Sequence, residues 1–135
     1  VLNQYLDDLD RGLGEIATLA KTLPLEYRER LERRISDLVG DIQVDPNRLI
    51  TEIAILADRS SIDEELVRLD SHIVEFRSAL MEDEPVGRKL DFLLQEMNRE
   101  VNTIGSKTTH VSIAKWVVEA KSTIEKLREQ IQNVE

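Results

Sequence analysis

The sequence contains no cysteine, only five glycines and three prolines, and 4% aromatic residues. The lack of cysteine excludes disulfides, thiolate catalysis and zinc–sulfur sites, and it fits a reducing compartment. Few glycines and prolines, together with 41% hydrophobic and 33% charged residues, favour helices over sheets or disorder. The few aromatic rings offer little surface for stacking the bases of single-stranded nucleic acid. We therefore expect an all-α fold.

Basic residues are outnumbered by acidic ones. The 135 residues include 18 Lys and Arg against 27 Asp and Glu, which gives a formal net charge of −9. This balance opposes a general nucleic-acid-binding surface, because phosphate attraction needs clustered cations. No apolar run is long enough to cross a membrane and no signal peptide is recognisable, so we expect a cytoplasmic protein. The chain begins with Val1 instead of Met, which hints at a piece of a longer protein.

Apolar residues recur every three or four positions in several segments, the spacing of one helix face. Asp45-Pro46 is a helix-start signal, with Asp45 as N-cap and Pro46 at the first helical position. Ser61 and Glu64 have the spacing of a capping box. We expect an antiparallel helical bundle or array, with residues 1–44 as a long helical hairpin or arm and residues 45–135 as a compact unit. The six expected helices cover about residues 1–22, 25–39, 46–59, 63–81, 87–107 and 111–134.

The segment 87–107 has an unusually varied polar face. One side of this helix is apolar, whereas the other mixes charged residues with Asn, Thr and Ser, which are poor choices for an exposed helix interior. We interpret this face as selected for contacts, either within a polar network or with a ligand. Its apolar stripe consists of Leu90, Leu93, Leu94, Met97, Val101 and Ile104, and its polar side of Arg88, Lys89, Asp91, Gln95, Glu96, Arg99, Glu100, Asn102, Thr103, Ser106 and Lys107.

The motifs around this segment resemble those of one family. The run Gly87–Lys107 contains GRKLDFLLQEMNRE, and it is preceded by Glu52-x6-Arg59 and by Glu64-Glu65-x2-Arg68-Leu69-x2-His72. With these motifs essentially the whole chain resembles the C-terminal half of the YicC family of bacterial proteins. The resemblance implies an endoribonuclease that cleaves single-stranded RNA with a divalent metal. It also implies a ring-like homo-oligomer, a hexamer.

Metal-assisted phosphodiester cleavage needs carboxylates, a group that activates water or the 2′-hydroxyl, and cations that face the phosphate. Oxygen ligands with one imidazole suit Mn²⁺ or Mg²⁺. Histidine titrates in the range that suits acid–base work, and Arg offers phosphate a bidentate fork. On this basis we expect catalytic roles for Glu96, Glu100 and His72; metal binding by Glu64, Glu65, Glu96 and Glu100; RNA-phosphate binding by Arg68, Arg88, Lys89, Arg99 and Lys107; and positioning by Asp91, Gln95 and Asn102.

Each of these residues also has a simpler interpretation. Two carboxylates one turn apart are common on solvated helices, and His72 could be a surface histidine paired with Glu65 or Glu75. The cations could pair with Asp91, Glu96 and Glu100 in a network between helices. Four arginines within residues 28–34 could grip phosphate, but interspersed glutamates favour a solvated face.

Two departures from the family pattern bear on function. The family normally carries a further N-terminal half, which is missing here, and Ser61 stands where members usually have an Asp that could bind metal. His110 falls in a turn that varies in the family and receives no role.

The alternative to an endoribonuclease is therefore a non-catalytic helical oligomerisation or regulatory module. A helical adaptor for another protein is a third hypothesis.

Overall fold

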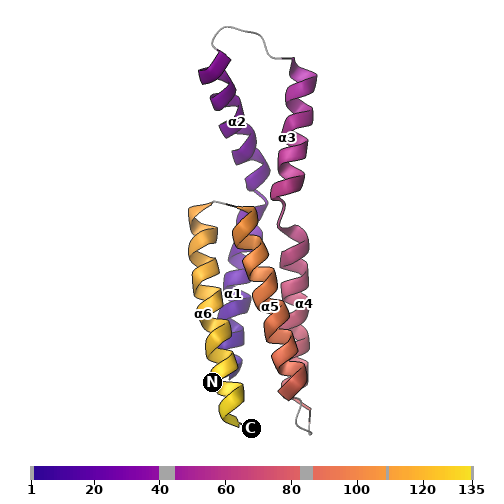
Figure 1. The fold of residues 1–135 in the computed structure, drawn as a ribbon, viewed down its shortest axis with the longest axis vertical. Coiled ribbons are helices and arrows are strands. Elements are labelled where there is room, and N and C mark those ends of the chain that lie inside the picture. The colour runs from indigo at the N-terminus through magenta and orange to yellow at the C-terminus, as the bar shows by residue number, and fades with distance from the viewer. Residues whose placement is uncertain (1, 40–44, 83–86, 109, 135) are drawn as a thin grey trace.

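The computed structural model describes residues 2–39, 45–82, 87–108 and 110–134. Within these ranges the secondary structure is entirely helical, which confirms the predicted all-α fold (Figure 1). None of the described helices has a stretch long and apolar enough to span a lipid bilayer. The helices are α1 (Leu2–Ala20), α2 (Leu23–Val39), α3 (Pro46–Ser60), α4 (Asp63–Leu80), α5 (Gly87–Lys107) and α6 (Val111–Val134).

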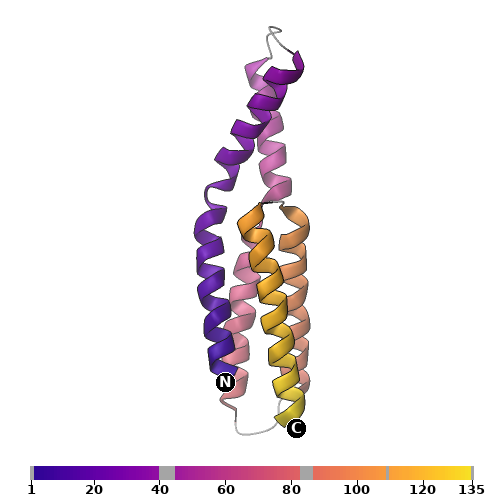
Figure 2. The ribbon, with the colours of Figure 1, turned by 90° about the vertical axis from the view of Figure 1, so that its left-hand side faces the viewer.

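Four helices form a bundle. The helices α4, α5, α6 and α1 pack in a closed ring, each antiparallel to its two neighbours, so the two chain ends lie together (Figures 1 and 2). On the outside, the Arg77 guanidinium of α4 donates to Asp7 at 2.8 Å and to Asp10 at 2.7 Å, which fixes α4 to α1. The largest fully buried side chains include Leu6, Ile62, Leu69, Ile73, Phe76, Leu93, Met97, Ile104, Ile113 and Leu127.

Two close approaches bring α6 against its neighbours. Trp116 is only 7% exposed and packs on Gly12 of α1, where an added Cβ would lie 2.6 Å from the indole Nε1. Gly105 of α5 faces Val117, with 3.3 Å between the position of an added Cβ and the Val117 Cγ1. Trp116 therefore belongs to the core.

The helices α2 and α3 form an arm that extends beyond the bundle (Figures 1 and 2). Only Lys21 and Thr22 separate α1 from α2, and α2 continues away from α1 instead of folding back on it. Pro24 lacks an N–H and so cannot continue the hydrogen bonding of α1. At the base of the arm, the buried Tyr27 hydroxyl donates to Thr108 Oγ1 at 3.2 Å.

The structure tests the two helix starts that the sequence predicts. Asp45 caps α3 as predicted, and its carboxylate accepts from the Asn47 N–H at 3.0 Å. The predicted capping box at Ser61 is wrong. Ile62 is buried in the core and occupies the N-cap position, so the Ser61 hydroxyl accepts only from the Asp63 N–H, at 3.4 Å.

The predicted division of the chain stays a prediction, because its boundary falls in residues 40–44, outside the described ranges. The contacts in the structure place α1 with α4 and α6, and α2 with α3. The physical reason is that α1 carries a continuous apolar stripe, which the bundle buries. The residues of that stripe are Leu6, Leu9, Leu13 and Ile16.

Candidate functional site

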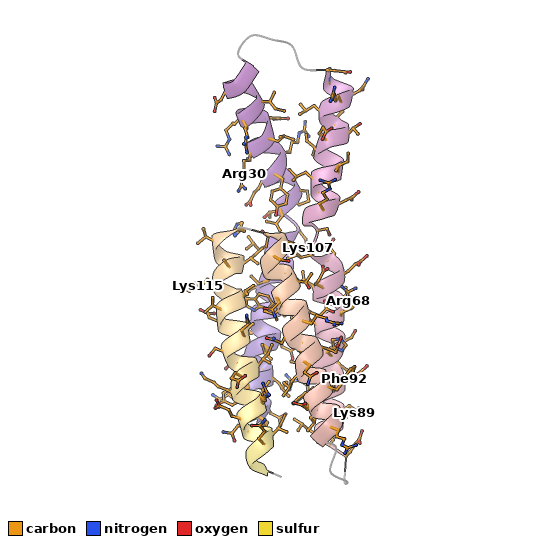
Figure 3. The ribbon with its side chains drawn as sticks, in the orientation of Figure 1. Arg30, Arg68, Lys89, Phe92, Lys107 and Lys115 are labelled. Carbon is orange, nitrogen blue, oxygen red and sulfur yellow. The ribbon has the colours of Figure 1, made fainter. Side chains whose placement is uncertain are left out.

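Several of the predicted site residues meet along one side of the contact between α4 and α5. The two helices are antiparallel neighbours, and their polar side chains face one another beside the apolar core. Figure 3 labels Arg68 on α4 and Lys107 near the upper end of α5. We refer to this side of the contact as the α4–α5 seam, and to Glu65, Arg68, Glu100 and Lys107 within it as the ion cluster.

The ion cluster connects the two helices by direct hydrogen bonds. The Arg68 Nε donates to Glu100 Oε1 at 2.9 Å. The Lys107 Nζ donates to Glu65 Oε1 at 2.7 Å and to the Ser61 carbonyl at 3.2 Å. Arg68 Nη2 also lies 3.5 Å from Glu65 Oε1, so both carboxylates share one guanidinium. Because Glu65 and Arg68 are three residues apart on α4, they project from the same face of that helix.

Burial and charge differ within the ion cluster. The two carboxylates are nearly inaccessible, with Glu65 3% and Glu100 5% exposed. The Arg68 side chain is 48% exposed and that of Lys107 is 31% exposed. Burial by itself raises the pKa of Glu65, but the hydrogen bond from Lys107 and the positive charges nearby outweigh it and lower that pKa. The hydrogen bond with Glu100 raises the pKa of Arg68. Two buried carboxylates thus hold two cations at the surface.

His72 lies on the same side of α4, one turn beyond Arg68. Since Arg68 contacts Glu100 across the antiparallel pair, the register places His72 opposite Glu96. His72 is half-buried, and its Nδ1 is buried without a hydrogen-bond partner, as is Glu65 Oε2. Buried polar atoms nearly always have a partner. Both atoms are exceptions to this rule, and both belong to the seam. Among the described residues, no ion pair joins His72 to Glu65 or Glu75, so the predicted surface pairing is wrong.

The remaining predicted residues are more dispersed. Lys89 lies 3.4 Å from Glu82, and Gln95 donates to Asp91 at 3.1 Å, on the half of α5 away from the ion cluster. Arg88 lines a separate hollow with Asp91 and Arg128. Arg99 is exposed and lies 3.9 Å from Glu96, and Asn102 is exposed. The structure therefore brings four of the thirteen predicted residues into the ion cluster and leaves the other nine outside it.

The sequence predicts a divalent-metal site in the seam, but the predicted ligands do not come together there within one chain. In the ranges described above, no three carboxylate or imidazole side chains are gathered to hold a metal ion. Glu64 is 83% exposed and lies 3.5 Å from Arg68 Nη1. Glu65 and Glu100 already accept hydrogen bonds from Lys107 and Arg68. The roles assigned to the individual residues stay predictions.

Sequence reasoning missed Phe92, which is 57% exposed on α5 (Figure 3). Phe92, Glu96 and Arg99 follow one another at spacings of four and three residues, so they share a strip of the helix surface beside the seam. An exposed aromatic ring next to an exposed arginine can stack on a nucleic-acid base. The sequence signal was available, because Phe92 lies outside the apolar stripe of α5.

Comparisons with known proteins agree on one family. The family model described as endoribonuclease YicC-like, C-terminal, matches residues 16–135. A probable endoribonuclease YicC of Clostridioides difficile (strain 630) is 51% identical over 130 residues, which cover 96% of this chain and 44% of that protein. A probable endoribonuclease YicC of Haemophilus influenzae is 39% identical over 135 residues, which cover 100% of this chain and 46% of that protein. The chain spans about half the length of these curated relatives.

Proposed function

Because the chain belongs to the family of endoribonuclease YicC-like C-terminal domains, we propose that it is the helical C-terminal part of an endoribonuclease that cleaves single-stranded RNA. The full-length protein would use a divalent metal, Mn²⁺ or Mg²⁺, and would act as a homo-oligomer, a hexamer. In this proposal the α4–α5 seam contacts the RNA. The observation that carries it is the ion cluster, in which buried carboxylates hold Arg68 and Lys107 at the surface.

The geometry suits RNA-backbone binding by fixed cations. Arg68 donates to Glu100 through its Nε, and its side chain is 48% exposed. A phosphate can therefore compete with the 3.5 Å contacts of its terminal nitrogens to Glu64 and Glu65. A guanidinium already fixed in direction loses little conformational entropy when it binds phosphate. Phe92 adds a ring on which a base can stack, which suits single-stranded RNA better than a duplex.

The seam also holds one group able to move a proton. The His72 side chain is half-buried beside α5, and its buried Nδ1 has no partner. The other ring nitrogen, Nε2, would accept the proton from the attacking water or 2′-hydroxyl, with Glu96 opposite to orient or stabilise the imidazolium. Glu100 has another role in this proposal, because its Oε1 is engaged by Arg68. Glu100 and Glu65 position the cations.

A divalent metal would supply charge stabilisation at the phosphate. The described seam does not gather a set of ligands for it, and we therefore assign no step of the reaction to a metal in this chain. The metal dependence belongs to the proposal for the full-length protein, whose other half could supply ligands.

The experiment that tests the proposal measures cleavage and binding of a labelled single-stranded RNA by the full-length protein, with and without Mn²⁺ or Mg²⁺. His72→Ala and Glu96→Gln should reduce cleavage while leaving RNA affinity nearly unchanged. Arg68→Ala should weaken RNA affinity. The matched control is Glu119→Gln, an exposed position on α6 away from the seam. Cleavage that is unaffected by His72→Ala and Glu96→Gln would contradict a catalytic role for the seam.

The second candidate is a non-catalytic module for oligomerisation or regulation of the full-length protein. The pairing within the ion cluster favours this candidate. One oxygen of Glu65 and one oxygen of Glu100 each accept a hydrogen bond from a cation of the same chain. In that case the same variants would alter thermal stability or assembly, while RNA affinity and cleavage per folded protein would stay at the wild-type level.

A further inference from the structure

The arm carries an open groove between α2 and α3. Its volume is about 340 Å³. Among the residues that the structure describes, the arm consists of two helices, and no third helix covers the apolar side chains that meet there. The groove is lined by Leu31 and Ile35 of α2, by Leu49, Ile55 and Leu56 of α3, and by the charged Arg48, Glu52 and Arg59 of α3.

The outer edge of this groove has a simple charge pattern. Glu52, Ile55 and Arg59 are three and four residues apart on α3, so they lie on one helix face. Ile55 is 41% exposed, and Glu52 and Arg59 are exposed on either side of it. In the part of the chain that the structure describes, no ion pair engages Glu52 or Arg59. The edge therefore presents one acidic and one basic side chain, two turns apart, around an exposed isoleucine.

We propose that this groove is covered by the same groove of a second copy of the chain, with the two α3 helices antiparallel across a two-fold axis near Ile55 and Leu56. This arrangement places Glu52 opposite Arg59 of the partner subunit, and by symmetry Arg59 opposite Glu52 of the partner subunit. A parallel pairing would instead set Glu52 against Glu52 of the partner subunit, and like charges repel. The pattern is thus self-complementary in the antiparallel arrangement.

The lining of the groove explains why we choose a second copy over RNA. RNA binding relies on clustered cations and on aromatic rings that stack with bases. The groove has five apolar aliphatic side chains and no aromatic ring, and a glutamate stands between its two arginines. Such a lining fits the half-exposed aliphatic side chains of another arm. The inference concerns a surface outside the α4–α5 seam, and it holds whether or not the seam contacts RNA.

Sedimentation velocity of the 135-residue chain tests the proposal by comparing the wild type with charge-reversal variants. The wild type should associate reversibly to dimers at concentrations between about 10 μM and about 1 mM, the range expected for a small interface. Glu52→Arg and Arg59→Glu should each weaken dimerisation by about tenfold or more, because each variant sets like charges opposite one another at both ends. An equimolar mixture of the two variants should recover the dimer, since the mixed pair places Arg against Glu at both ends.

The matched controls are Glu119→Arg and Lys121→Glu, which make the same changes in sign at exposed positions on α6. They should dimerise like the wild type, and circular dichroism should show wild-type helicity for all four variants. The proposal is overturned if the wild type stays monomeric over the whole range, which would leave the groove to RNA or to another protein. It is also overturned if the arm variants and the controls associate equally, or if the mixture of folded variants does not recover the dimer.

Discussion

The Lys107 ammonium lies 2.7 Å from Glu65 Oε1, and Glu65 is only 3% exposed. The contact joins the first turn of α4 to the last turn of α5, 42 residues apart in sequence. A buried carboxylate without a cation is costly, whereas a pair with good geometry roughly offsets its own desolvation. The position of Lys107 therefore decides whether Glu65 can stay ionised inside the bundle.

Removal of Lys107 alone should destabilise the chain more than removal of the whole pair. Lys107→Met leaves Glu65 buried with only the 3.5 Å contact to Arg68, and we expect a loss of about 2 kcal/mol in the free energy of unfolding. Glu65→Met combined with Lys107→Met should recover most of this loss. Urea unfolding followed by circular dichroism measures both. Lys115→Met, at an exposed position of α6, should change stability by less than about 0.5 kcal/mol. A double variant as unstable as Lys107→Met would contradict this interpretation.

The stability of the fold should depend on pH through Glu65. The pKa of Glu65 in the folded chain is lower than its ordinary value of 4.5. The stabilisation from this group is therefore present above about pH 4.5 and is lost as the pH falls through the folded pKa. We expect the free energy of unfolding to fall less steeply for Glu65→Gln than for the wild type between about pH 5 and pH 3. Parallel curves for the two proteins would show that the lowered pKa contributes nothing to stability.

Two glycines of α1 should respond to alanine in opposite directions. An added Cβ at Gly12 would lie 2.6 Å from Trp116 Nε1 in the core, so Gly12→Ala should cost about 1–3 kcal/mol. At Gly14 an added Cβ meets nothing within 4 Å, so Gly14→Ala should stabilise by about 0.5–1 kcal/mol through helix propensity. Thermal unfolding of both variants checks the pair. Equal effects of the two substitutions would mean that Trp116 does not pack closely on α1.

Phe92 should matter for RNA and little for the fold. Because its side chain is 57% exposed, Phe92→Ala should leave the unfolding temperature nearly unchanged. In the full-length protein it should weaken binding of single-stranded RNA by about 1–3 kcal/mol, the usual value for one stacked base. Fluorescence anisotropy with a labelled RNA measures the change. Val118→Ala, at an apolar position of α6 that is 70% exposed, is the control. Equal RNA affinity for the two variants would exclude stacking on Phe92.

The helices were predictable from the sequence because each carries a regular apolar stripe and most of them end at a clear signal. The Asp45-Pro46 start of α3 is one such signal, and the structure has the cap there. The side-by-side position of α1 and α6 was not predictable. It depends on the lack of a Cβ at Gly12, which makes room for Trp116, and periodicity does not reveal this contact.

The candidate site was predictable in composition and not in arrangement. The polar side of residues 87–107 did indicate a contact face, and it includes Glu100 and Lys107 of the ion cluster. Which carboxylates are free and which are paired depends on the register between α4 and α5. In that register Arg68 pairs with Glu100 and Lys107 pairs with Glu65. The sequence had suggested these two glutamates as metal ligands.

The most direct test of the account is to map where RNA touches the protein. Photo-crosslinking of the full-length protein to single-stranded RNA that contains 4-thiouridine, followed by mass spectrometry of the peptides, locates the contacts by residue. The account predicts crosslinks in α4 around Arg68 and His72, and in α5 at Phe92 and near Lys107. Loss of these crosslinks with unlabelled competitor RNA would show that they are specific. Crosslinks confined to the other half of the protein or to the arm would contradict the proposal that the α4–α5 seam binds RNA.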